Sequence, residues 1–238
     1  MAVTPLRHAR LMMLQTRCAG CDRVGAVLCR PCRFSLAAPA SMPVGGDVIA
    51  AVPFVGRARD VLLGFKYRNR RQLAHHFAGL LVNRLLAEGI RPGDVDVVTW
   101  APTSRRRRHQ RGFDQAEVVA RRVAAQLGLP CRRLLERDSA SAPQTGLDRA
   151  ARLHGPTFRA SPRTVGQSVL LIDDVVTTGS TLRSADRALR DGGARSVVRA
   201  AVATTPALVH RANTKRPTRP NRRRSADRGV VVQGPWAA

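Results

Sequence analysis

The stretch "VLLIDDVVTTGST" (residues 169–181) combines an apolar run, an acidic pair and a hydroxyl-rich segment. Four apolar residues precede Asp173 and Asp174, and two valines separate these carboxylates from residues 177–181. The apolar run predicts a buried strand, and the Thr/Gly/Ser segment predicts a loop that opens a helix. Polar groups therefore gather where the strand ends and the helix begins.

Apolar strands alternate with helical segments along the rest of the chain. This alternation predicts an α/β fold with a doubly wound, mostly parallel sheet that helices cover on both faces. In such a sheet, ligands bind beyond the carboxyl ends of the strands. The expected strands are 47–54, 95–102, 168–174 and 196–204, and the expected helices are 57–67, 70–88, 113–128, 145–154 and 180–191.

The chemistry of the opening stretch fits a ligand with a phosphate at one end and a diol nearby. The N-terminus of a helix attracts anions through its free N–H groups, and a glycine lets the backbone approach a phosphate closely. The segment that would bind the phosphate is Thr177, Thr178, Gly179, Ser180 and Thr181. Asp173 and Asp174 repel phosphate, so they should face ligand hydroxyls or a metal. The alternative is a solvated acidic pair followed by an ordinary helix cap.

All thirteen residues of this stretch resemble the signature of type I phosphoribosyltransferases, which bind phosphoribosyl pyrophosphate with Mg²⁺. The resemblance implies that Asp173 and Asp174 are the catalytic residues and hold the ribose hydroxyls, while residues 177–181 bind the 5-phosphate. It also implies displacement of pyrophosphate from ribose C1, which depends on positioning and electrostatics and needs no nucleophilic side chain. The sequence does not name the acceptor.

A second polar stretch, "APTSRRRRHQRGFDQAEVVA" (101–120), begins where the strand 95–102 ends and so lies on the same rim. Its arginines could neutralise a pyrophosphate leaving group or grip a nucleic-acid backbone, or they could form a solvated loop. "RGFDQA" resembles the R-G-F-N-Q-A stretch of ComF proteins, with Asp114 in place of the usual Asn. The residues assigned to pyrophosphate or nucleic-acid phosphate are Arg105, Arg108, Arg111 and Lys66.

Further matches to the ComF family fall in order along the chain. "FKYRNRRQLA" (65–74) resembles its K-Y segment, and "APQTGLDRAARLHGPTF" (142–158) resembles its Q-T-G-L stretch, with His154 where Asn is usual. Gln144 could lie over the site or serve packing alone. The resemblance implies a cytoplasmic role in natural transformation, with single-stranded DNA and a competence helicase as candidate partners. A non-catalytic binding module that retains the phosphoribosyl pocket is the alternative.

Four cysteines near the N-terminus have the spacing C-x₂-C-x₇-C-x₂-C: Cys18, Cys21, Cys29 and Cys32. Two such pairs complete a tetrahedral thiolate site, which predicts a small structural Zn²⁺ module resembling a zinc finger. The gap is shorter than the common spacing of about 15–20 residues, yet long enough for a tight hairpin. Disulfides are the alternative and are disfavoured in the cytoplasm. Cys131 lies apart.

The net charge is +25, from 41 basic and 16 acidic residues. It favours polyanionic partners, although GC-rich coding also explains it, because only two of the basic residues are lysines. The basic segment 206–238 predicts a disordered tail. No apolar run approaches the roughly 20 residues of a membrane span, which favours a cytoplasmic protein. The expected domains are a zinc module (14–38), a phosphoribosyltransferase-like domain (47–205) and the tail.

Overall fold

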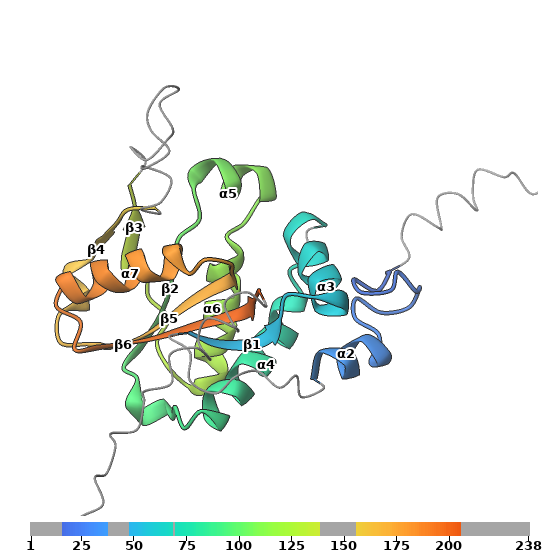
Figure 1. The fold of residues 1–238 in the computed structure, drawn as a ribbon, viewed down its shortest axis with the longest axis horizontal. Helices are drawn as coiled ribbons and strands as arrows, with labels where there is room; N and C mark the ends of the chain where they lie inside the picture. The colour runs from blue at the N-terminus through green and yellow to red at the C-terminus, as the bar shows by residue number, and fades with distance from the viewer. Residues whose placement is uncertain (1–15, 38–47, 69, 139–155, 206–238) are drawn as a thin grey trace, which may run out of the picture.

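A computed structural model describes residues 16–37, 48–68, 70–138 and 156–205. Its centre is a four-stranded parallel sheet with the strand order β1-β6-β5-β2 (Figure 1). This sheet confirms the predicted α/β architecture. Its strands are β1 (Ile49–Pro53), β2 (Val97–Trp100), β5 (Ser168–Val176) and β6 (Ser196–Thr204).

Helices cover both faces of the sheet, as the sequence predicted. Two helices, α4 (Leu73–Ala87) and α6 (Gln115–Leu127), pack on one face. On the other face, α7 (Ser180–Asp191) packs together with the antiparallel pair β3 (Leu135–Arg137) and β4 (Phe158–Ala160). The two faces carry separate hydrophobic clusters, because adjacent strand residues point to opposite sides.

The cysteine-rich segment packs against the sheet domain through two helices, α2 (Arg30–Ala37) and α3 (Gly56–Tyr67) (Figure 1). Cys18 and Cys32 belong to the same buried cluster as Phe65 of α3. The ring of Phe65 meets those of Phe77 and Phe113 edge-on, with centroids 5.4 and 5.5 Å apart. The aromatic trio therefore ties α3 to α4 and to the start of α6.

The short helix α5 (Arg105–Arg111) occupies a segment to which the sequence analysis assigned no helix. The Ser104 hydroxyl caps its N-terminus by accepting from Arg107 N at 3.3 Å, and Gly112 ends it with φ +73°. Strand β5 also runs to Val176, beyond its predicted end at 174.

Two 3₁₀ turns, η1 (Pro92–Asp94) and η3 (Pro162–Thr164), complete the described secondary structure. The predicted helix 145–154, the residues Gln144 and His154, and the basic tail 206–238 lie outside the described residues. Within the described ranges, no helix is both long enough and apolar enough to cross a membrane.

Candidate functional site

The acidic pair lies at the carboxyl end of β5, near the centre of the parallel sheet. Each carboxylate accepts a hydrogen bond from the backbone N–H of the next residue. Asp174 N donates to Asp173 Oδ1 at 2.8 Å, and Val175 N donates to Asp174 Oδ1 at 2.6 Å. These bonds fix both carboxylates while leaving each a second oxygen for another partner.

Lys66, at the end of α3, reaches this acidic pair. Its Nζ lies 2.9 Å from Asp174 Oδ2, and both side chains are only 14% exposed. The sequence analysis assigned Lys66 to a ligand phosphate, whereas the structure pairs it with Asp174. A lysine in this position compensates one of the two negative charges.

Asp173 keeps its proton more tightly than an ordinary aspartate. Burial, followed by the neighbouring charge of Asp174, raises the pKa of Asp173 to about 8. The ammonium of Lys66 opposes this shift but does not reverse it. Near neutral pH the pair therefore carries less than two full negative charges.

This raised pKa makes the stability of the protein depend on pH. Between about pH 4, where an unfolded aspartate titrates, and about pH 8, the folded state binds more protons at Asp173 than the unfolded state. Stability should therefore fall as the pH rises through this window and level off above it. Asp173→Asn should remove that part of the slope, measured as Tm at successive pH values without added Mg²⁺. Equal slopes in the two proteins would contradict the assignment.

The loop after β5 turns directly into α7. Gly179 adopts φ +75°, a left-handed backbone conformation that favours glycine. The Thr178 hydroxyl accepts from Ser180 N at 3.4 Å and lies 3.1 Å from the Ser180 hydroxyl. No acidic residue occupies the first turn of α7. This helix N-terminus is therefore suited to an anion.

A cavity of about 330 Å³ lies beyond these strand ends. Its wall includes several residues that the sequence analysis assigned to the ligand: Lys66, Arg111, Asp173, Asp174, Thr177 and Thr181. Arg105 and Arg108 are exposed on α5 and do not line it. Thr178, Gly179 and Ser180 form the adjoining turn without lining it. The cavity thus gathers the carboxylates and part of the hydroxyl-rich segment against a basic wall.

Other lining residues were not among those that the sequence analysis assigned to the site: Arg107, Arg137, Gln115 and Tyr67. Arg107 belonged to the arginine run, and helical spacing places it on the same side of α5 as Arg111. Arg137 belongs to the short strand β3, for which no pattern was recognised. Burial, and then the charge of Arg107, lowers the pKa of Arg137.

Asp114, which replaces the usual Asn of ComF proteins, has a structural role in this chain. It is 5% exposed and caps α6, with Oδ1 accepting from Ala116 N at 3.1 Å. Its Oδ2 accepts from Thr103 N at 2.8 Å, which ties the loop after β2 to the helix. Burial raises the pKa of Asp114.

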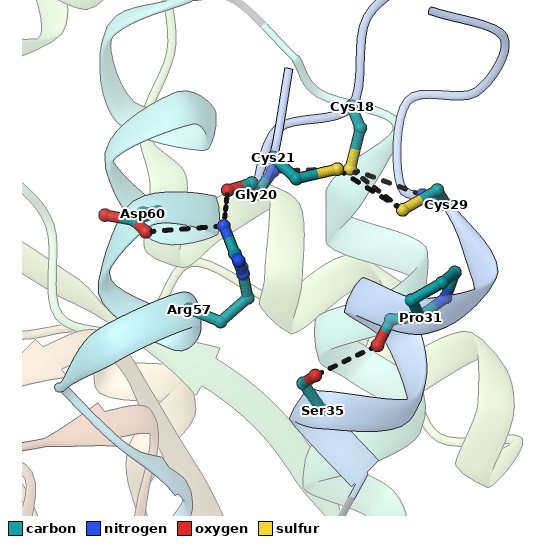
Figure 2. Close-up of polar contacts among 8 residues, drawn as sticks. All are labelled: Cys18, Gly20, Cys21, Cys29, Pro31, Ser35, Arg57 and Asp60. Atoms are coloured by element: carbon teal, nitrogen blue, oxygen red, sulfur yellow. Dashed lines mark hydrogen bonds and ion pairs between the residues drawn. The ribbon is translucent and has the colours of Figure 1, made fainter. Parts of the chain in front are cut away.

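The four N-terminal cysteines converge, as their spacing predicted, and each pair of their sulfur atoms lies within 4.8 Å. Cys18 Sγ is 3.5 Å from Cys29 Sγ, and Cys21 Sγ is 3.6 Å from the same atom (Figure 2). Four thiolates about 2.3 Å from one Zn²⁺ lie roughly 3.8 Å apart in a tetrahedron. The donor set therefore fits a closed structural metal site.

Backbone groups prepare one of these sulfurs for a metal. Burial opposes ionisation of Cys18, but hydrogen bonds from Cys29, Gly20 and Cys21 outweigh it and lower the pKa of the Cys18 thiol to about 6. The N–H groups of Gly20 and Cys29 each lie 3.4 Å from its sulfur. Metals bind thiolate, so this environment favours coordination.

The cysteine cluster is fastened to α3, the helix that carries Lys66. Arg57 Nη1 of α3 donates to the carbonyl of Gly20 and lies 4.0 Å from Asp60 (Figure 2). A Cβ at Gly64 of α3 would lie 3.1 Å from the Ala19 side chain. The module and α3 therefore pack closely, and movement of one affects the other.

Comparison with known proteins identifies the kind of domain that contains the cavity and its carboxylates. A family model described as the phosphoribosyl transferase domain matches residues 114–230. This match confirms the type I phosphoribosyltransferase fold that residues 169–181 predicted. The chain's curated relatives support the narrower ComF-like family.

Two of these relatives bear the name DNA utilization protein YhgH. The Salmonella typhimurium protein is 27% identical over 198 residues, covering 76% of this chain and 85% of that protein. The Salmonella typhi protein is 30% identical over 137 residues, covering 56% of this chain and 60% of that protein.

Solved structures with similar folds include enzymes that handle phosphoribosyl groups. The B. subtilis glutamine phosphoribosylpyrophosphate amidotransferase is 21% identical with a TM-score of 0.42, covering 58% of this chain and 30% of that one. The adenine phosphoribosyltransferase of Thermoanaerobacter pseudethanolicus is 15% identical with a TM-score of 0.40, covering 63% and 78%.

Proposed function

We propose that the chain binds phosphoribosyl pyrophosphate with Mg²⁺ and transfers the ribosyl phosphate to an acceptor. The observation that carries the proposal is a cavity at the end of β5. It joins two carboxylates to the start of α7 on one side and to three arginines on the other. A ribose with phosphates at both ends matches that order of charges.

Each group has a defined task in this proposal. Asp173 and Asp174 accept hydrogen bonds from the ribose hydroxyls, and the turn 177–181 donates to the 5-phosphate. Arg107, Arg111 and Arg137 neutralise the pyrophosphate as it leaves C1, which stabilises the transition state electrostatically. Arg105 and Arg108 lie outside the cavity and serve the approach of an anion. Mg²⁺ supplies further charge neutralisation on oxygen ligands, which this ion prefers.

Calorimetric titration with phosphoribosyl pyrophosphate and Mg²⁺ tests binding, and pyrophosphate release with a panel of bases and amines tests transfer. Saturable binding with one ligand per chain is the expected result. Release that depends on one acceptor would identify the reaction. Absence of binding at millimolar ligand would overturn the proposal.

We also propose that the four cysteines hold a structural Zn²⁺. The convergence of their four sulfur atoms supports this assignment. The module then comprises residues 14–38 and the transferase-like domain residues 47–205. Because four protein ligands fill the tetrahedron, the ion has no open position for chemistry.

The second candidate function is a binding module for single-stranded DNA or a helicase in the cytoplasm, with the pocket retained as a ligand site. Two observations favour it: the name of the curated relatives, and the exposed arginines of α5 beside the cavity. Inactivity with every acceptor, together with salt-sensitive DNA binding, would favour this function over transfer.

Removal of residues 206–238 tests where DNA would bind. From Thr205 onward the sequence carries eight Lys/Arg residues and one acid. If the tail contacts phosphates, its removal should weaken single-stranded DNA binding and flatten the dependence of affinity on salt. Binding of phosphoribosyl pyrophosphate should not change. Titration by fluorescence anisotropy at several salt concentrations measures both quantities. An unchanged salt slope would move the DNA site to α5 or eliminate it.

A further inference from the structure

Gln115, the first residue of α6, has no role in the function proposed above. It lines the cavity, yet its side chain is only 1% exposed. Its Oε1 accepts from Arg111 Nη1 at 3.0 Å, while its buried Nε2 has no hydrogen-bond partner among the described residues. An unpaired buried donor destabilises a folded protein, so this position indicates that a ligand completes the bond.

The neighbours of Gln115 determine which end of its amide faces Arg111. An arginine only donates hydrogen bonds, so the atom that it contacts must be the amide oxygen. The guanidinium is itself held against the ring of Tyr67, 5.4 Å from the centroid. The adjacent Asp114 accepts from Thr103 N and Ala116 N, and no described residue accepts from the Gln115 Nε2. The amide NH₂ is therefore left to donate to something other than these residues.

The partner must offer an oxygen, and the charges around it favour an anionic one. Arg107, Arg111 and Arg137 line the same cavity. We propose that Gln115 donates from Nε2 to a pyrophosphate oxygen of the ligand, next to Arg111. The inference rests on the proposed function and adds a binding residue to it. Phosphoribosyl pyrophosphate and free pyrophosphate share this phosphoanhydride chemistry, and the titrations below separate them.

Protein atoms cover Nε2, so the amide must turn toward the ligand when it binds. The last torsion of a glutamine side chain is broad, and this rotation costs little. Arg111 can move with it, because its side chain is partly exposed. The hydrogen bond then compensates the donor that the described residues leave unpaired.

Gln115→Glu is the sharpest test, because it preserves shape and an oxygen for Arg111 while replacing the donor with a negative acceptor. We expect the affinity for magnesium pyrophosphate and for phosphoribosyl pyrophosphate to fall more than tenfold. The affinity for ribose 5-phosphate should change less than twofold. Gln126→Glu, on the exposed C-terminal part of the same helix, makes the same charge change away from the cavity and should leave all three affinities intact.

Gln115→Met separates a ligand contact from a structural role, because it removes both polar ends. We expect about tenfold weaker pyrophosphate binding with an unchanged or higher Tm. A lower Tm with unchanged affinity would mean that an internal water satisfies the amide, and the inference would be wrong. If wild-type protein bound neither pyrophosphate nor phosphoribosyl pyrophosphate, the proposed function would fail instead. Wild-type binding that both Gln115 variants retain would overturn this inference alone.

Discussion

Asp174→Asn should weaken phosphoribosyl pyrophosphate binding by about tenfold to a hundredfold while the fold stays intact. A charge-assisted hydrogen bond contributes about 1.5–3 kcal/mol, and each 1.4 kcal/mol corresponds to about a factor of ten in affinity. The carboxylate of Asp174 is held in place by Lys66, so its replacement also frees a lysine inside the cavity. Calorimetric titration of both proteins at constant Mg²⁺ measures the loss.

Inorganic phosphate separates the carboxylate from the phosphate-binding turn. Its affinity should stay the same or rise in Asp174→Asn, because a negative charge is lost. Thr178→Val should weaken binding of both ligands, since the Thr178 hydroxyl organises the turn before α7. Asp191→Asn, an exposed aspartate at the end of α7, is the matched control. Unchanged phosphoribosyl pyrophosphate affinity in Asp174→Asn would mean that the acidic pair is an ordinary strand end.

Lys66→Met tests whether the ion pair acts as a unit. If Lys66 serves the site by orienting Asp174, the effects of Lys66→Met and Asp174→Asn should not add in the double variant. If Lys66 instead leaves Asp174 and binds a ligand phosphate, the two losses should add. The same titrations, applied to the four proteins of the cycle, distinguish these outcomes.

Cys29→Ser should abolish stoichiometric zinc and loosen the N-terminal module, and this is the second large effect expected. Structural zinc sites contribute about 10–16 kcal/mol of apparent binding free energy in small zinc-binding peptides. Cys29 Sγ lies close to both Cys18 and Cys21, so its loss opens the tetrahedron. Metal analysis of protein purified without added zinc should fall from one ion per chain to near zero.

Hydrogen exchange should locate the damage. Amides of residues 16–37 and of α3 should exchange faster in Cys29→Ser, while β5 and β6 remain protected. Because α3 carries Lys66, phosphoribosyl pyrophosphate binding should weaken as well. Cys131 lies apart from the cluster, so Cys131→Ser should change neither the zinc content nor the hydrogen exchange of the module. Wild-type protein that holds no zinc and has four free thiols would exclude the metal site.

The sequence by itself determined the elements whose signals are local. Continuous apolar runs followed by polar residues predicted the parallel strands, because a strand buried on both faces does not alternate polar and apolar residues. The order of chemistries in residues 169–181 predicted a polar strand end followed by a helix that starts with glycine and hydroxyls. The spacing of the four cysteines predicted their cluster, since two C-x₂-C pairs so close in the sequence can meet through local folding.

The choice among the arginines needed the tertiary structure. Without a predicted helix, residues 105–111 gave no reason to prefer one arginine, and Arg105 and Arg108 were selected with Arg111. In α5, Arg107 and Arg111 are four residues apart and share the side that faces the cavity. A helix of seven residues with a polar sequence on every side has no hydrophobic period to reveal it.

Contacts between residues far apart in the sequence likewise could not be predicted and needed the tertiary structure. Lys66 meets Asp174 because the aromatic trio and the cysteine module fix the end of α3 above β5. Arg137 lines the cavity from β3, a short strand that pairs with β4. The role of Gln115 could be inferred only from the structure, where its amide oxygen accepts from Arg111 and its amide nitrogen is buried without a partner among the described residues. Local patterns position residues along their own element, whereas a binding site forms where side chains from several elements converge.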